Sequence, residues 1–321
     1  LDQKRSILEI RDRLTLEQGR VTIDGRFEGE GPYVTGRDRD VLIDGDGIVE
    51  FKGTYNRFLS FRELTVDEGV SILYTADRSA SGEDQVRLKG QMLFTRGEHD
   101  VGASWGFQQD GRLNLEGDSV VRIDTNEMVN NGQVSLTDST LIVRRSSDPE
   151  ATFTNASTGR IEGTGTLDVS EISFINEGFI SPGLSPGTLE ILGDYVQSPA
   201  GTLVLEVSGG DEGPRDQIVI TGNASLGGSI EVIFLGDYLP TSEDAFEFLT
   251  VSGTVEGQFD QATARGAGPG GGRFDIMQDG NSFMLTNYQP IPEPGAIGVL
   301  TVMSVAIGGR RRRRRANAPI A

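Results

Sequence analysis

A chain of 321 residues is long enough for a substantial core, and a formal net charge of −19 makes nucleic acid an unexpected partner. The absence of cysteine excludes disulfides, thiolate metal sites and cysteine nucleophiles. The single histidine, His99, is a poor start for a zinc site or a catalytic triad, so we expect an ordinary surface or loop residue there.

The first residues, LDQKRSILEIRDRL, contain no charged region leading into an apolar core of the kind that makes a signal peptide. We expect the chain to be either a fragment or a protein whose export signal has been removed. The sequence does not distinguish these two possibilities.

From about Leu14 to Leu285 the sequence consists of short segments in which apolar and polar residues alternate, each closed by Gly, Asn, Asp or Ser. A period of two, rather than 3.6, indicates strands with one buried face. In the segment GTLVLEV the inward residues would be Leu203, Leu205 and Val207. The chain is therefore predicted to be all-β.

Three segments of the middle region resemble one another, namely MVNNGQVSL, FTNASTGRIEG and FINEGFISPG. Their asparagines, Asn130, Asn155 and Asn176, are 25 and 21 residues apart. This spacing suits one coil of a parallel β-helix, or solenoid, in which an asparagine amide can bond along a ladder of rungs. A β-sandwich with strands every 8–12 residues is the competing interpretation.

After Ile180 the strands become longer and the turns more hairpin-like, as expected of a unit that caps an open solenoid end. The runs FINEGFISPGLSPGTLEILGDY, DQIVITGNASLGGSIEV and FEFLTVSGTVEGQFD fall within Phe153 to Asp260. Together they resemble the rungs and capping region of bacterial autotransporter-like passengers. The resemblance implies a right-handed parallel β-helix and an exported protein, without implying a particular chemistry.

The C-terminus joins the turn-like stretch PIPEP to an apolar run from Gly295 to Gly309 and six arginines. The apolar run is shorter than the roughly 20 residues of a spanning helix, but a short hydrophobic helix crosses when the bilayer thins. Arginines after it would stay on the cytoplasmic side and place the acidic domain outside. The residues of this stop-transfer cluster are Arg310, Arg311, Arg312, Arg313, Arg314 and Arg315.

The sequence Pro292, Glu293 and Pro294, followed by the apolar run and the arginine cluster, resembles the PEP-CTERM sorting signal. The resemblance implies that an exosortase, a bacterial membrane cysteine protease, recognises these three residues and removes the tail after export. Membrane anchoring would then be transient. We predict three parts: β-helix rungs over residues 1–187, a β-rich C-terminal capping region over 188–289, and a sorting tail over 290–321.

No motif predicts a catalytic, cofactor-binding or metal-binding residue. VLIDGDGIVEF resembles one rung of the polygalacturonases, but the remaining elements of that family are absent. Glycoside hydrolysis needs two facing carboxylates, and a pair such as Asp44 and Asp46 stays open. GGDEGPRDQI, from Gly209, resembles a calcium-binding nonapeptide of repeat toxins, yet it occurs once and its spacing is off.

We therefore predict a non-enzymatic, exported bacterial surface or extracellular-matrix protein with an adhesive or structural role. Its expected partners are exosortase, the membrane before processing, and an extracellular polysaccharide. One alternative is a polysaccharide-active β-helix enzyme, a lyase or glycosidase, which would be favoured by several acids and an arginine or lysine converging in a groove. Another is a calcium-stabilised binding module.

Overall fold

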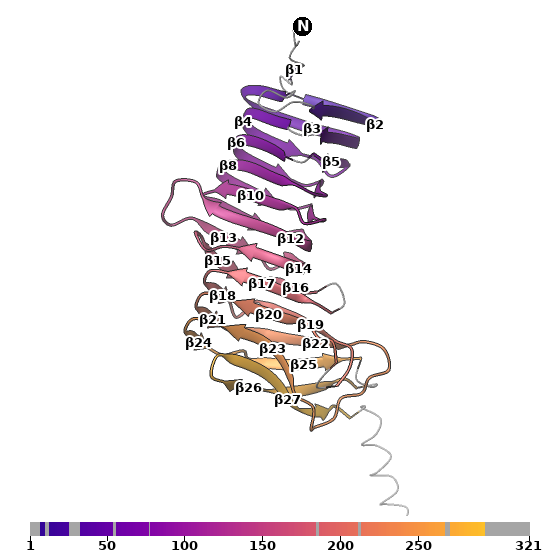
Figure 1. Cartoon of the computed structure of the whole chain (residues 1–321), viewed down its shortest axis with the longest axis vertical. Coiled ribbons are helices and arrows are strands. Elements are labelled where there is room, and N and C mark those ends of the chain that lie inside the picture. Colours follow the sequence, from indigo (N-terminus) through magenta and orange to yellow (C-terminus); the bar gives the residue numbers. More distant parts are fainter. Residues whose placement is uncertain are drawn as a thin grey trace, which may run out of the picture.

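The computed structural model describes residues 7–9, 13–25, 33–53, 56–76, 78–183, 186–210, 213–266 and 270–292. All regular secondary structure in these ranges is β-strand, from β1 (Ile7–Glu9) to β27 (Ser282–Pro290). The prediction of an all-β protein is confirmed for this part of the chain. The strands stack into an elongated rod (Figure 1).

The strands pair in parallel and form three stacks, which we call the first, second and third faces. The first face contains β7 (Gln91–Phe94), β9 (Arg112–Leu115), the starts of β12 (Gln133–Arg145) and β14 (Arg160–Asp168), β16 (Phe179–Pro182), β19 (Thr202–Val207), β22 (Ser229–Phe234) and β25 (Gln261–Arg265). The second contains the start of β8 (Glu98–Gln109), β10 (Val120–Thr125), the ends of β12 and β14, β17 (Thr188–Leu192), β20 (Gln217–Ile220) and β23 (Phe246–Val251).

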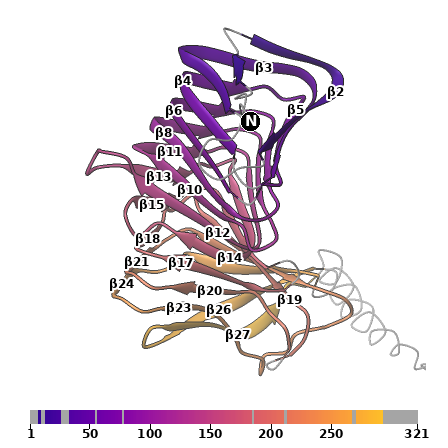
Figure 2. The same ribbon diagram turned by 45° about the horizontal axis from the view of Figure 1, so that its top comes forward.

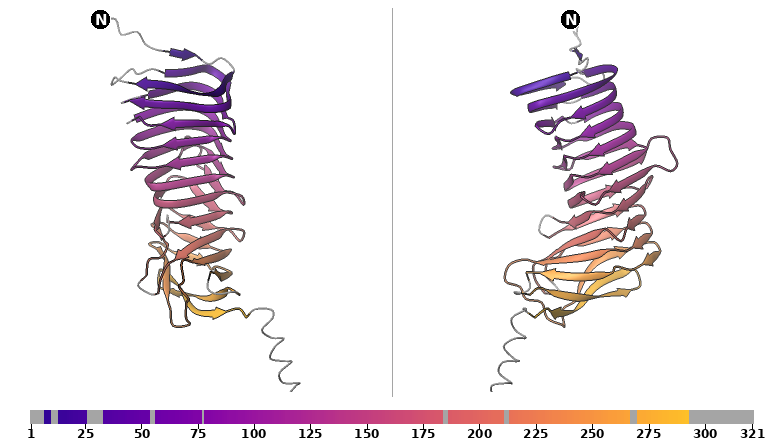
Figure 3. Two further views of the ribbon diagram at one scale, coloured as in Figure 1. Left: turned by 90° about the vertical axis from the view of Figure 1, so that its right-hand side faces the viewer. Right: turned by 180° about the vertical axis from the view of Figure 1, so that it is seen from behind.

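The third face contains the end of β8, then β11 (Glu127–Asn130), β13 (Thr152–Asn155), β15 (Ser173–Asn176), β18 (Tyr195–Gln197), β21 (Ala224–Leu226) and β24 (Val255–Gly257). The chain visits the second, third and first faces in turn, and each circuit is one coil. The predicted solenoid is thus confirmed in preference to the sandwich, and Figure 3 shows its coils from the side and from behind.

The N-terminal coils use long strands that turn corners and so contribute to more than one face. These are β2 (Arg13–Gly25), β3 (Tyr33–Gly53), β4 (Asn56–Val66) and β6 (Arg78–Leu88), with the shorter β1 and β5 (Val70–Tyr74) beside them. Where their side chains are described, inward and outward positions alternate along them as well. Val86 and Leu88 of β6, for example, are fully buried.

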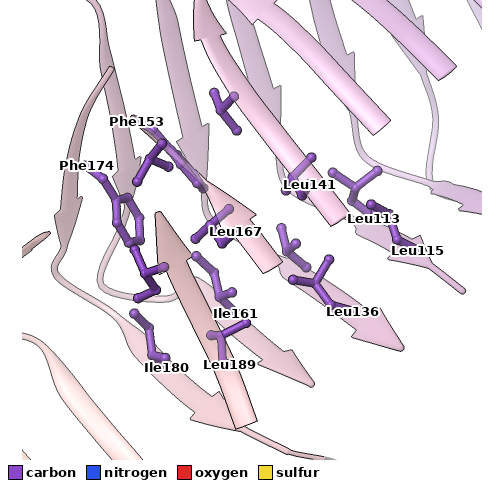
Figure 4. Close-up of a cluster of buried hydrophobic side chains, with 14 of the residues drawn as sticks. Leu113, Leu115, Leu136, Leu141, Phe153, Ile161, Leu167, Phe174, Ile180 and Leu189 are labelled. Carbon is purple, nitrogen blue, oxygen red and sulfur yellow. The ribbon is translucent and has the colours of Figure 1, made fainter. Parts of the chain in front are cut away.

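The core is a column of apolar side chains along the inside of the coil. Figure 4 shows residues from all three faces meeting there: Leu136, Ile161 and Ile180 from the first, Leu141, Leu167 and Leu189 from the second, and Phe153 and Phe174 from the third. Burying each such side chain stabilises the fold by roughly 1.5–3 kcal/mol. The predicted inward residues Leu203, Leu205 and Val207 are also buried, which confirms their assignment.

A ladder of side-chain amides runs along the inside of the third face. Asn130 Nδ2 donates to Asn155 Oδ1 at 2.7 Å, and Asn155 Nδ2 donates to Asn176 Oδ1 at 2.7 Å. The predicted asparagine ladder is therefore confirmed. It continues beyond the sequence repeat at one end, because Asn176 Nδ2 donates to Gln197 Oε1 at 3.0 Å. At the other end Gln109 occupies the register position before Asn130, but its Nε2 donates to the backbone oxygen of Gln133 at 3.1 Å.

The C-terminal end of the rod is closed by an antiparallel hairpin, β26 (Gly272–Asp279) and β27. β26 pairs with β25 of the first face, and β27 pairs with β23 of the second face. The hairpin therefore occupies the end of both faces (Figure 2). Parallel pairing continues through β17, β20 and β23 up to this point. The division of the chain at residue 187 stays a prediction.

The described residues include no helix of the length and apolarity needed to cross a bilayer. The predicted short C-terminal helix falls outside the described part of the chain, as do Glu293, Pro294 and the cluster Arg310–Arg315.

Candidate functional site

A groove of about 540 Å³ lies on the first face, over β14, β16, β19, β22 and β25. We call it the first-face groove. Its lining combines charged, small and apolar side chains: Arg160, Glu162, Phe179, Ser181, Gly183, Val204, Glu206, Glu231, Ile233 and Arg265. A hollow of this volume falls in the range of small-molecule binding sites.

The groove is hollow because small residues occupy outward positions between larger charged ones. Ser181 is the register partner of Glu162, and Val204 is the register partner of Glu231. Val204 lines the groove but is only 6% exposed, so it belongs to the floor. At Gly183, with a φ of 88°, an added Cβ would lie 2.3 Å from the backbone nitrogen of Gly187, and only glycine fits.

Both arginines of the groove have partners within it. The guanidinium of Arg160 lies 5.3 Å from the ring centroid of Phe179, its neighbour on the next rung, in a cation–π contact. Arg265 forms an ion pair with Glu231, whose side chain is 17% exposed. The Arg265 side chain itself stays 73% exposed, so this pair faces solvent on one side.

Three carboxylates face the same space, on different rungs. Glu162 accepts a hydrogen bond of 3.0 Å from Ser135 Oγ. Glu206 and Glu231 lie on adjacent rungs and are offset by two positions, which places their Cα atoms about 8 Å apart for ordinary strand spacing. Across the described residues, no three His, Cys, Asp or Glu side chains come close enough together to hold a metal ion.

Asp216, buried to 1% exposure, supports one wall of the groove. Its Oδ1 accepts the backbone N–H of Gly187 at 2.8 Å, and its Oδ2 accepts the backbone N–H of Glu206 at 2.8 Å. Burial raises the pKa of this carboxyl to about 7, although the two N–H donors act in the opposite direction. The Asp216 side chain thus links β19, which carries Glu206, to Gly187, the residue that precedes β17.

The sequence did not identify Asp216 as a buried acid. It belongs to the segment from Gly209 that was considered for calcium, but here it serves as an acceptor for backbone groups. The other candidate acids are elsewhere on the rod. Asp44 accepts a hydrogen bond of 2.7 Å from Thr15 Oγ1 and forms an ion pair with Arg13 at 2.9 Å, at the N-terminal end far from the groove in the coil order.

The expectation that His99 is a surface or loop residue is wrong. His99 is fully buried, and its ring packs beside Phe94 and Tyr74 with centroid separations of 4.9 and 5.6 Å. Its Nε2 lies 2.6 Å from the carbonyl oxygen of Arg96; because a carbonyl only accepts, Nε2 carries the hydrogen. Burial lowers the pKa of this imidazole, so it is a neutral core residue.

Of the predicted sorting motif, the structure describes Pro292, which is exposed. The preceding Ile291 donates its backbone N–H to Gly271 O at 3.1 Å and is 42% exposed. Glu293 and Pro294 lie outside the described residues. The motif therefore begins within two residues of the end of β27.

The sequence matches no known protein-family model and no curated protein.

Proposed function

We propose that this chain is a non-enzymatic bacterial surface or extracellular-matrix protein, a right-handed parallel β-solenoid that is exported and sorted through a PEP-CTERM signal. The observation that carries the proposal is the position of the motif. β27 ends at Pro290, and Ile291 and Pro292 are exposed directly after it. A processing protease would reach the motif without unfolding the capped rod.

The surface of the rod supports a structural or adhesive role. Several of its charges are paired across coils, as in the contacts of Arg144 with Asp124 at 2.8 Å and of Arg122 with Glu98 at 3.3 Å. Each exposed pair contributes little, about 0–1 kcal/mol. Many such pairs along a rod leave long outer faces that are charged, soluble and available for contact with a matrix.

The test is the intact mass of the protein recovered from the outside of its host. We expect a mature mass that ends near Pro290 to Gly295. Glu293→Ala should leave the chain full-length in the membrane, whereas Glu256→Ala, an exposed acid on the third face, should be processed normally. Full-length protein in all three cases would contradict the sorting proposal.

The first-face groove favours a second candidate, a polysaccharide-active enzyme. Glu206 and Glu231 line it from adjacent rungs, and glycoside hydrolysis uses two carboxyl groups on either side of the scissile bond. The assay is the release of new reducing ends or unsaturated sugars from a panel of polysaccharides. Turnover that is lost in both Glu206→Gln and Glu231→Gln would establish this candidate, and an absence of turnover across the panel would contradict it.

A further inference from the structure

We propose that the first-face groove binds a polysaccharide strand that carries free amino groups. The inference rests on the proposed function in one respect, because a protein at the cell surface is where such a polymer would be encountered. It depends on three properties of the groove, which are its direction, its polarity and its charge.

The groove runs across the rungs from Arg160 on β14 to Arg265 on β25. Four rung steps separate these strands, which amounts to about 19 Å at a strand spacing of about 4.8 Å. The length suits a short run of sugar rings.

The lining matches the two kinds of surface that a sugar ring presents. Val204 and Ile233 supply apolar area for the C–H faces of the rings, beside the Phe179 ring that Arg160 contacts. The Ser181 hydroxyl and the carboxylates of Glu162 and Glu206 can accept or exchange hydrogen bonds with ring substituents. Such a mixture of apolar area and a few placed polar groups is typical of specific small-molecule sites.

An extended peptide is a poorer match to the groove. β16, β19 and β22 are each paired to a neighbour on both sides, so no strand edge is open to receive main-chain hydrogen bonds from a peptide. Recognition must therefore go through side chains alone, which suits a polymer without a peptide backbone.

Charge selects the class of polysaccharide. The groove holds three carboxylates and two guanidinium groups, and Glu231 and Arg265 pair with each other, so the lining carries one more negative than positive group. The whole chain carries −19, which disfavours an anionic polymer. Since the carboxylates sit on separate rungs and gather into no metal site among the described residues, they suit cationic groups spaced along a strand.

The experiment is calorimetric titration of the full chain, at low salt and about pH 5.5, with chitosan oligosaccharides, their fully N-acetylated counterparts and polygalacturonate. We expect binding of the chitosan oligosaccharides, at least about tenfold weaker binding of the acetylated ones, and no binding of polygalacturonate to the groove.

Variants locate the binding. Glu162→Gln and Glu206→Gln should each weaken chitosan binding by about fivefold or more, and the double variant by more than about twentyfold. Glu256→Gln removes the same charge from the third face and should leave the affinity unchanged. Ser181→Lys keeps both glutamates but adds a cation beside Glu162, its register partner, and should also weaken binding. Unchanged melting temperatures would show that all variants fold.

Equal binding of acetylated and free oligosaccharides, or an equal effect of Glu256→Gln, would overturn the inference. If polylysine binds as tightly as chitosan and is equally sensitive to Glu206→Gln, the inference is overturned, and a basic protein segment becomes the favoured ligand of the groove. Processing of the tail is measured by mass and does not depend on sugar binding, so failure here leaves the proposed sorting untouched.

Discussion

Asn130 and Asn155 are register partners on successive coils, and the side-chain amide of Asn130 donates a hydrogen bond of 2.7 Å to Oδ1 of Asn155. Both residues are fully buried. Asn155 and Asn176 each accept a hydrogen bond from the amide of the previous coil and donate one to the amide of the next, so a register slip would leave buried polar groups unpaired. The ladder therefore specifies register as well as adding stability.

Replacing Asn155 by alanine should destabilise the rod strongly. The change removes one of the two acceptors of Asn130 Nδ2, which keeps Arg160 O, and leaves the buried Oδ1 of Asn176 without its amide donor, at about 1–3 kcal/mol for each lost bond. We expect a clear fall in the thermal midpoint by circular dichroism. Thr154→Ala, on the outward side of the same strand, should change it little, and equal effects of the two variants would contradict the role of the ladder.

Two glycines with positive φ should respond very differently to alanine. At Gly163, with φ 111°, an added Cβ would lie 1.8 Å from the carbonyl oxygen of Leu136 on the previous coil. At Gly236, with φ 66°, it would meet nothing within 4 Å. We expect Gly236→Ala to cost about 1 kcal/mol and Gly163→Ala more than about 3 kcal/mol, measured by denaturant unfolding. Similar losses of stability in the two variants would show that backbone strain, and not contact with the neighbouring coil, determines the cost of the added Cβ.

His99 should titrate below the usual histidine pKa of about 6.5. Its buried imidazole is neutral, whereas the unfolded chain takes up a proton, so the free energy of unfolding falls as pH drops below about 6.5. As the chain has one histidine, a single imidazole signal in an NMR titration reports its pKa directly. His99→Phe should remove this pH dependence while keeping the ring between Phe94 and Tyr74 filled; a pKa above 6.5 would contradict the prediction.

Asp216 should change the pH dependence of stability in the direction opposite to His99. Its native pKa, raised by burial to about 7, means that the native state holds the proton more tightly than the unfolded chain. The free energy of unfolding therefore rises as pH falls from 8 toward 5, by up to about 1.4 kcal/mol per pH unit below the native pKa. Measured against Asp216→Asn, in which His99 is unchanged, the difference between the two proteins should vary with pH. A constant difference would show that Asp216 does not titrate in this range.

Several features could be predicted from residues alone because they repeat locally. Alternation identified the strands and the inward set of Leu203, Leu205 and Val207. The spacing of Asn130, Asn155 and Asn176 predicted the solenoid and its ladder. Gln109 and Gln197 were missed, because they occupy the register position of the asparagines but carry a different side chain. The signal that could have identified them is their position at the end of a strand, which matches that of the asparagines.

The sequence by itself determined the class of fold, because strand periodicity and coil length are properties of neighbouring residues and survive without knowledge of distant contacts. Only the tertiary structure decided that His99 lies in the core, that Asp216 ties Gly187 to Glu206, and that Glu162, Glu206 and Glu231 share a groove. The physical reason is the stacking of coils: which side chains become neighbours, and which lose water, depends on the register between segments that are 20 or more residues apart.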